Sequence, residues 1–194
     1  MRRGGAPART RLLEGATAIR PFTPADVPEL TALRIANRPY TEPFEPRRHP
    51  SFYTAAGQAQ EIALDERVWV AGSGYAFAVL DVAAGDCIIG RVALANVVLG
   101  AWGNATLGYW VDEAGRGRGH ATAAVRCALR FAFGEAGLHR VQPAIMPRNA
   151  PSRRVVEKAG FRHEGRALRY LEIDGVWEDH DIFAITAEEF EAPR

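Results

Sequence analysis

The pattern of hydrophobic and polar positions divides the chain into segments of two different periods. Runs rich in β-branched and aromatic residues predict strands at residues 16–21, 75–81, 87–98, 105–111 and 139–146. Apolar residues spaced three or four positions apart predict helices over 23–37, over 54–66 and from 121 to about 133–137. A shorter helix follows Asn149 and ends at Gly160, and two final strands, 162–173 and 176–186, flank a turn at Asp174-Gly175.

These elements predict an α/β fold in the order β-α-α-β-β-β-α-β-α-β-β. No internal repeat or linker divides the chain, so we expect a single domain over residues 16–190. Thr23, followed by Pro24 and Asp26, predicts the start of the first helix, because these residue types favour a cap and a first turn. Residues 38–50 are expected to be irregular, because four prolines interrupt them.

The composition is that of an ordinary soluble protein. The 194 residues are 47% hydrophobic and 24% charged, and the formal net charge is +1. These values give no sign of a nucleic-acid partner, and no apolar run approaches the roughly 20 residues of a membrane-spanning helix. Residues 1–15 are basic but lack an apolar segment, which indicates a disordered tail and not a secretory signal. The alternative for this tail is an arm that contacts RNA or acidic protein.

Cysteine and histidine usage favours a cytoplasmic protein without a metal site. The chain has two cysteines, Cys87 and Cys127, which lie far apart in different predicted elements. We expect both to be reduced core thiols. The five histidines show no spacing typical of metal ligands, so no metal is expected.

Residues 107–121 combine a predicted strand, a glycine-rich turn and the start of a predicted helix. Gly115, Gly117 and Gly119 occupy every second position of the turn, and arginines stand between them. The start of a helix leaves backbone N–H groups unpaired and carries a partial positive charge. Glycines also let the backbone approach a ligand closely. The stretch therefore predicts a phosphate-binding site, with an ordinary glycine-rich connection as the alternative.

Three known phosphate-binding layouts can be compared with this stretch. A nucleotide-triphosphate loop requires Gly-Lys-Ser/Thr, but Gly119 is followed by His120. A dinucleotide fingerprint requires Gly or Ala where this chain has Thr122. The third layout, Gln/Arg-x-x-Gly-x-Gly/Ala, is matched by Arg116, Gly119 and Ala121. This third match resembles the coenzyme A pyrophosphate loop of the Gcn5-related N-acetyltransferases (GNAT).

Three more segments carry a resemblance to the Rim-type branch of that family, the ribosomal-protein alanine/serine N-terminal acetyltransferases. Asn149-x-x-Ser152 followed by the segment 158–161, Lys-Ala-Gly-Phe, is similar to one signature of the branch. The segment 43–46, Pro-Phe-Glu-Pro, and the ending 173–180 are similar to two others. The resemblance implies the GNAT acyl-CoA N-acyltransferase fold. That fold is a central, mostly antiparallel twisted sheet, splayed at the acetyl-CoA site and flanked by helices.

The resemblance also implies which residues bind acetyl-CoA. The strand backbone before the glycine turn would pair with the pantetheine amides, and the N–H groups of the turn would hold the pyrophosphate. The expected donor-binding residues are Tyr109, Trp110, Val111, Arg116, Gly117, Arg118, Gly119, His120, Ala121 and Asn149. The alternatives are purely core roles for Tyr109 and Trp110 and a purely capping role for Asn149.

For catalysis, the resemblance points to Ser152 as the donor of a hydrogen bond or proton to the leaving sulfur. The alternative for Ser152 is that it only begins a helix. Many relatives carry a Glu in the strand before the glycine turn, where this chain has Thr106. Glu172 is the candidate base, directly or through water, and Phe44 and Glu45 are expected to bind the acceptor.

The implied function is the transfer of an acetyl group from acetyl-CoA to the N-terminal α-amine of a protein or peptide, such as a ribosomal protein. An α-amine, with a pKa of about 7.7–8.0, is neutral on the order of a tenth of the time at pH 7. A lysine amine, with a pKa of about 10.4, is neutral only a few times in ten thousand and needs a stronger base. The alternatives are a small-molecule amine, such as an antibiotic or polyamine, and a non-catalytic CoA-binding module. The expected assembly is a monomer or a homodimer.

Overall fold

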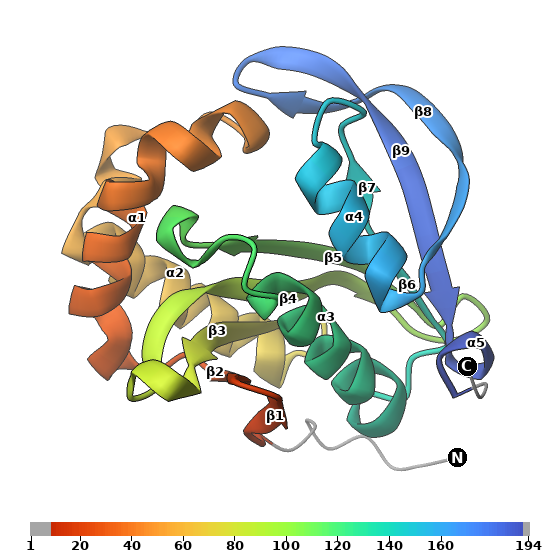
Figure 1. Ribbon diagram of the computed structural model, residues 1–194, viewed down its shortest axis with the longest axis horizontal. Coiled ribbons are helices and arrows are strands. Elements are labelled where there is room, and N and C mark those ends of the chain that lie inside the picture. The colour runs from red at the N-terminus through yellow and green to blue at the C-terminus, as the bar shows by residue number, and fades with distance from the viewer. Residues whose placement is uncertain (1–8, 192–194) are drawn as a thin grey trace.

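The computed structural model describes residues 9–191 as a mixed sheet covered by helices (Figure 1). Within these residues, nine strands run in the order β1-β2-β3-β4-β5-β6-β9-β7, with β8 paired to β9. Neighbouring strands are antiparallel except β5 and β6, which are parallel. The expected α/β fold with a mostly antiparallel sheet flanked by helices is confirmed.

The strands span Leu12–Glu14 (β1), Thr17–Pro21 (β2), Tyr75–Asp81 (β3), Cys87–Val98 (β4), Asn104–Val111 (β5), Arg140–Gln142 (β6), Ala144–Ile145 (β7), Arg162–Ile173 (β8) and Val176–Thr186 (β9). The helices span Val27–Thr41 (α1), Ala55–Val70 (α2), His120–Arg130 (α3), Ala150–Ala159 (α4) and Ala187–Glu191 (α5). A π-helical turn, Phe131–Glu135, extends α3. Each predicted helix is therefore found, and so are the predicted strands except the one over 139–146, some with shifted ends.

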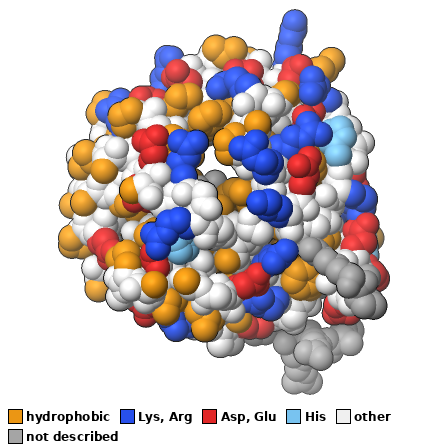
Figure 2. Space-filling view, in the orientation of Figure 1, with side chains coloured by type: hydrophobic (Ala, Val, Ile, Leu, Met, Phe, Trp, Pro, Cys, Tyr) orange, Lys and Arg blue, Asp and Glu red, His pale blue; other side chains and the backbone are white. Residues whose placement is uncertain are grey.

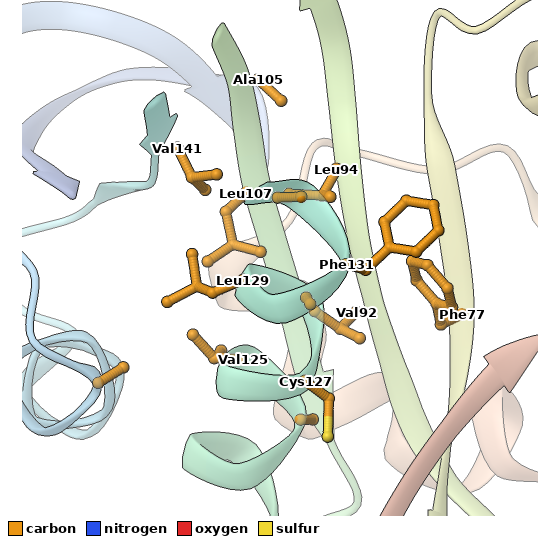
Figure 3. Close-up of a cluster of buried hydrophobic side chains, with 14 of the residues drawn as sticks. Phe77, Val92, Leu94, Ala105, Leu107, Val125, Cys127, Leu129, Phe131 and Val141 are labelled. Carbon is orange, nitrogen blue, oxygen red and sulfur yellow. The ribbon is translucent and has the colours of Figure 1, made fainter. Parts of the chain in front are cut away.

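The main core lies between α3 and the strands β3, β4 and β5 (Figure 3). Val125 and Leu129 of α3 are fully buried, because the helical spacing of the apolar residues puts them on one face. At the end of the helix, the ring of Phe131 packs edge-on against Phe77 of β3, with 5.0 Å between ring centroids. The glycine turn that precedes α3 is thus attached to a rigid, well-packed helix.

The opposite face of the same strands is covered by α1 and α2. Successive residues of a strand point to opposite faces, so Phe77 and Val79 pack toward α3 while Ala78 and Leu80 pack toward Leu30 of α1. β3 is consequently buried along its whole length. A sheet covered on both sides holds its strand ends in fixed positions, and the site described below is built on those ends.

The sheet opens between β5 and β6. The two strands pair only over Asn104–Thr106 and Arg140–Gln142, and β5 then continues to Val111 without β6 beside it. The single strand expected over 139–146 is therefore wrong. Pro143 divides it into β6 and β7, and β7 pairs with β9 instead. Proline has no backbone N–H to donate and fixes its own φ angle, so it interrupts the ladder at the point where the strands separate.

The described part of the N-terminal segment is more ordered than the disordered tail expected over residues 1–15. Leu12–Glu14 forms β1 and pairs with β2, so the expected disordered tail does not extend to residue 15. Gly15, with a φ of +57°, makes the tight turn between the two strands. Ion pairs from Glu14 to Arg126 and Arg130 of α3 then hold β1 in place. Residues 1–8 of the expected tail lie outside the described residues.

The proline-rich segment is also more regular than expected. α1 continues through Pro39 to Thr41, and a 3₁₀ turn follows at Glu42–Phe44. A proline removes only its own N–H, and the next turn still closes, because the N–H of Glu42 bonds to the carbonyl of Arg38. In the part of the chain that the structure describes, no helix is both long and apolar enough to cross a membrane.

Candidate active site

A cavity of about 680 Å³ lies where β5 separates from its neighbour. Its walls come from β5, the glycine turn, the first turns of α3 and α4, β7, and the segment that follows α1. Figure 2 shows this face hollowed near its centre, with Lys and Arg side chains around the opening. The expected site residues that line it are Phe44, Glu45, Tyr109, Val111, Arg116, Gly117, Gly119, His120, Ala121, Asn149 and Ser152.

The glycine turn forms one end of the cavity. Gly117 and Gly119 have φ angles of +75° and +87°, and a Cβ atom on either would meet no protein atom within 4 Å. Gly119 is also the residue that caps α3, so the unpaired N–H groups of the first helical turn begin there. A bare backbone beside a helix N-terminus fits a phosphate group.

Three basic side chains line the same cavity: Arg116 from the turn, and Arg154 and Lys158 from α4. The Arg116 guanidinium lies 3.4 Å from the Glu113 carboxylate and 5.0 Å from the centre of the Tyr40 ring. Their charges complement a ligand that carries several phosphates. Arg154 and Lys158 were not among the expected site residues. The packing of α4 puts these two side chains on the cavity side, and the sequence motifs do not indicate that packing.

Arg118 and His120 fasten the turn to the sheet. The Arg118 guanidinium is 3.0 Å from the carboxylate of Asp81, which is 2% exposed. His120 Nδ1 lies 2.9 Å from the hydroxyl of Thr17, and its Nε2 lies 3.5 Å from Asp81. The buried Asp81 carboxylate needs a counter-charge, and Arg118 supplies it. Arg118 is therefore not among the residues that line the cavity. A direct contact of Arg118 or His120 with a ligand stays a prediction.

The end of β5 presents alternate residues to the cavity. Tyr109 and Val111 line it, whereas Trp110 points to the other face and lies under the Arg34 guanidinium, 4.1 Å from the ring centre. For the Trp110 side chain, this position agrees with the alternative of a purely core role. Beyond Thr106 the backbone of β5 has no strand partner on the cavity edge, so its polar groups are available to a ligand.

Tyr109 is joined to the first turn of α4. Its hydroxyl lies 2.7 Å from the Ser152 hydroxyl and 2.9 Å from the Ser152 carbonyl oxygen. Burial raises the pKa of the Tyr109 phenol well above its usual range, so it stays protonated. Asn149 caps the same helix, because its side-chain oxygen accepts the N–H of Ser152 at 3.2 Å. The capping role of Asn149 is thus observed, and its contact with a ligand stays a prediction.

Another part of the cavity wall is formed by the segment after α1. Arg34 donates to the Glu45 carboxylate at 2.8 Å, and both side chains are largely buried. Burial lowers the pKa of the Arg34 guanidinium, and the nearby negative charge of Glu45 opposes that change. The Glu45 carboxylate at the cavity wall therefore has a fixed partner behind it.

This segment is also connected to the β8–β9 hairpin. The N–H of Asp174 bonds to the carbonyl of Glu45 at 3.1 Å, and Arg148 donates to the carbonyl of Pro43 at 3.0 Å. Arg47 forms an exposed ion pair with Asp174 at 3.2 Å. Residues far apart in the sequence thus form one wall, which no single motif could have indicated.

The structure separates Glu172 from the cavity and adds His180 to it. Glu172 is exposed on β8 opposite Trp177 and does not line the cavity, so its role as base stays a prediction. His180 of β9 lines the cavity, is 3% exposed, and bonds through Nδ1 to the Glu178 carbonyl at 3.0 Å. A lone histidine in a strand pattern gives no signal that distinguishes it from a core residue. Across residues 9–191, no group of three or more His, Cys, Asp or Glu side chains could hold a metal ion.

The comparisons with known proteins agree with this geometry. Residues 17–162 match the model of the acetyltransferase (GNAT) domain. A Bacillus subtilis protein named as a probable N-acetyltransferase, YjcK, is 39% identical over 90% of this chain and 96% of its own length. The [ribosomal protein uS5]-alanine N-acetyltransferase of Escherichia coli is 29% identical over 96% of this chain and 95% of its own length. The structure of Mycobacterium smegmatis RimJ in complex with CoA-disulfide superposes with a TM-score of 0.86 and is 32% identical, covering 91% of this chain and 84% of that one.

Proposed function

We propose, for a chain that belongs to the acetyltransferase (GNAT) family, that its acceptor is the N-terminal α-amine of a protein, such as a ribosomal protein. The chain is an N-acetyltransferase, and acetyl-CoA is its acetyl donor. The observation that supports the acceptor most is the likeness to RimJ and to the uS5-alanine N-acetyltransferase, which extends over nearly the whole chain.

The cavity has the features that acetyl-CoA binding needs. The bare backbone of Gly117 and Gly119 and the first N–H groups of α3 would hold the pyrophosphate, with charge supplied by Arg116. The unpaired edge of β5 would hydrogen-bond the amides of the pantetheine arm. When bound, acetyl-CoA supplies an acyl carbon activated as a thioester.

Ser152 and the end of β5 would act on the two atoms that gain negative charge. A backbone N–H near Val111 would stabilise the carbonyl oxygen of the reacting acetyl group. Ser152, at the first turn of α4, is the group that would donate to the leaving sulfur, and Tyr109 holds its hydroxyl. Both contributions act mainly in the transition state.

The charges in the cavity favour an acceptor that needs little help to lose a proton. Glu45 lies at the acceptor end, but its carboxylate is already paired with Arg34. Such an anion suits the binding of an ammonium group better than the removal of its proton. An α-amine, with a pKa of about 7.7–8.0, supplies a useful neutral fraction at pH 7 without a strong base.

The proposal can be tested with peptides that contain both a free N-terminus and an internal lysine. One peptide begins with Ala and another with Ser, and the matched control is the Ala peptide with a blocked N-terminus. CoA release and mass spectrometry of the product should place the acetyl group on the free α-amine, with no product from the blocked peptide. Acetylation confined to the lysine, or found only on small amines such as spermidine, would contradict the proposal.

A further inference from the structure

We propose that His180 is the general base of the acetyl transfer and accepts a proton from the acceptor amine on its Nε2 atom. His180 lies on β9 and lines the cavity while being almost fully buried. The proposal rests on the N-acetyltransferase activity and not on which amine is the acceptor. It therefore goes beyond the function proposed above.

The main chain determines which nitrogen of the His180 ring is basic. Nδ1 lies 3.0 Å from the carbonyl oxygen of Glu178. A carbonyl oxygen only accepts hydrogen bonds, so Nδ1 carries the hydrogen. In the neutral imidazole the lone pair then resides on Nε2. The backbone of β9 thus selects the tautomer in which Nε2 is ready to accept a proton.

The neighbouring strands position the ring beside the cavity. β7 pairs with β9 so that Ile145 lies opposite Asp181, and Ile145 and Met146 line the cavity together with His180. On the other side, Ala167 of β8 lies opposite His180, and the Tyr170 ring packs against the imidazole with 5.8 Å between ring centroids. The ring is fixed by these contacts and by the Nδ1 bond, which is the condition for a base of defined geometry.

The other histidine in the cavity is not equivalent. His120 Nδ1 bonds to Thr17, and His120 Nε2 is buried without a hydrogen-bond partner, 3.5 Å from the Asp81 carboxylate. That atom is covered by protein, so an amine has no access to it. His120 belongs to the anchor of the glycine turn, at the phosphate end of the cavity.

The carboxylates near the cavity either form ion pairs with arginines or do not line the cavity. Glu45 is paired with the buried Arg34, and Glu178 is paired with Arg148 at 2.9 Å. Glu172 is exposed and does not line the cavity. A carboxylate that already accepts hydrogen bonds from a guanidinium has part of its lone pairs engaged. His180 is the group at the cavity wall with a nitrogen lone pair and no ionic partner among the described interactions.

The proton balance of the step is complete with the groups named. The amine nitrogen forms a bond to the acetyl carbon, and the proton it loses moves to His180 Nε2. The carbon–sulfur bond breaks, and the sulfur receives a proton from Ser152 or from water. His180 then returns its proton to solvent, and Ser152 or the hydroxide left by water recovers a proton from solvent. The free enzyme is thereby restored, and the products are the N-acetyl amine and CoA.

The first test is kinetic and uses His180→Asn. The Asn side-chain amide can still donate to the Glu178 carbonyl in place of Nδ1, but it has no atom at the position of Nε2. General bases contribute about 10²–10⁴-fold, so we expect kcat to fall at least about 100-fold with little change in the KM of acetyl-CoA. The matched control is His163→Asn on β8, which does not line the cavity and should keep the parent kcat.

The pH profile separates a base from a structural residue. In the parent enzyme kcat/KM should rise with pH, because a general base acts in its unprotonated form, and His180→Asn should lose that limb. The Tyr170 ring of β8 packs against His180, the Glu178 carbonyl bonds to its Nδ1 while the Glu178 carboxylate pairs with Arg148, and Glu45 lines the same cavity. The variants Tyr170→Phe and Glu178→Gln should therefore retain the limb if His180 is its source.

The second test needs no turnover. Long-range ¹H–¹⁵N correlation spectra of the labelled protein report the tautomer of each histidine, and the His180 signals are those missing in His180→Asn. We expect hydrogen on Nδ1 and a free lone pair on Nε2. A parent-like kcat and pH profile in His180→Asn, or hydrogen on Nε2 of the neutral ring, would overturn the proposal. If peptides fail as acceptors but another amine is acetylated, the acceptor assignment fails, and the same variants test His180 with that amine.

Discussion

The phenol oxygen of Tyr109 lies 2.7 Å from the hydroxyl of Ser152 and 2.9 Å from the Ser152 carbonyl oxygen. The carbonyl can only accept, so Tyr109 donates its hydrogen to it, and the Ser152 hydroxyl is then the donor in the contact with the phenol oxygen. One strand end and one helix start are thereby joined across the cavity. The rotation of the Ser152 side chain, and with it the direction of its own hydrogen, depends on this contact.

We predict that Ser152→Ala lowers kcat about tenfold or more while the KM of acetyl-CoA changes little. A group that donates to the leaving sulfur acts in the transition state, so its loss reduces turnover more than binding. Tyr109→Phe, which keeps the ring but removes the hydroxyl, should lower kcat in the same direction and by less. Steady-state kinetics check both variants. An unchanged kcat in Ser152→Ala would leave that residue with a structural role at the start of α4.

We predict that Gly119→Glu abolishes acetyl-CoA binding. The new side chain would project into the cavity and add negative charge where the pyrophosphate is expected. Gly137→Glu is the matched control, because Gly137 also has a positive φ and open space around its Cβ position but does not line the cavity. Both variants share the cost of that backbone conformation, about 1–2 kcal/mol. Calorimetric titration should show binding only in the control, and tight binding by Gly119→Glu would exclude the site.

We predict that Glu45→Gln raises the KM of the acceptor about tenfold and leaves the KM of acetyl-CoA unchanged. The substitution removes an anion from the acceptor end and leaves the buried Arg34 without its partner, so the thermal midpoint should also fall. Asp174→Asn is the comparison, since it breaks the exposed pair with Arg47 in the same wall. Exposed pairs contribute about 0–1 kcal/mol, so this variant should behave like the parent. Equal KM values in all three proteins would remove Glu45 from the acceptor site.

We predict that Asp26→Asn destabilises the protein at neutral pH but not in acid. Burial alone would raise the pKa of Asp26, but the hydrogen bonds from Arg20 and Thr23 outweigh it and lower the pKa. A lowered folded-state pKa contributes stability that is present above the unfolded-state pKa, about 3.9, and is lost as pH falls through the folded-state value. Urea unfolding should show a loss of about 1–3 kcal/mol at pH 7 that shrinks below about pH 4. A difference independent of pH would contradict the stated cause.

Much of the fold follows from local rules that act over a few residues. The turn at Asp174-Gly175 has φ angles of +44° and +82°, as the two-residue turn requires, and the strands on both sides have the expected ends. Gly160 ends α4 in the left-handed conformation for the same kind of reason. At these positions the residue types alone restrict the φ angles of the backbone.

The parts that local rules missed depend on neighbours distant in sequence. Pro143 reads as an ordinary residue in an apolar run until β6, which pairs with both β5 and β9, is distinguished from β7, which pairs with β9. Arg118 has the position of a phosphate ligand in its motif, yet it pairs with Asp81, a buried residue of another strand. The tautomer of His180 depends on a carbonyl orientation that no spacing encodes. Strand divergence, charge pairing and the orientation of a backbone carbonyl determine these three features, and each arises only in the folded structure.

The anchoring of the glycine turn by Asp81 has a thermodynamic consequence. Arg118, His120 and Thr17 hold the turn against the sheet from within the protein, so its shape does not depend on a bound ligand. A preorganised loop loses little conformational entropy when it binds a phosphate group, so the free energy of binding is more favourable. Loop amides in the free protein should then exchange slowly with solvent, and Arg118→Met should speed that exchange and weaken acetyl-CoA through a less favourable entropy of binding.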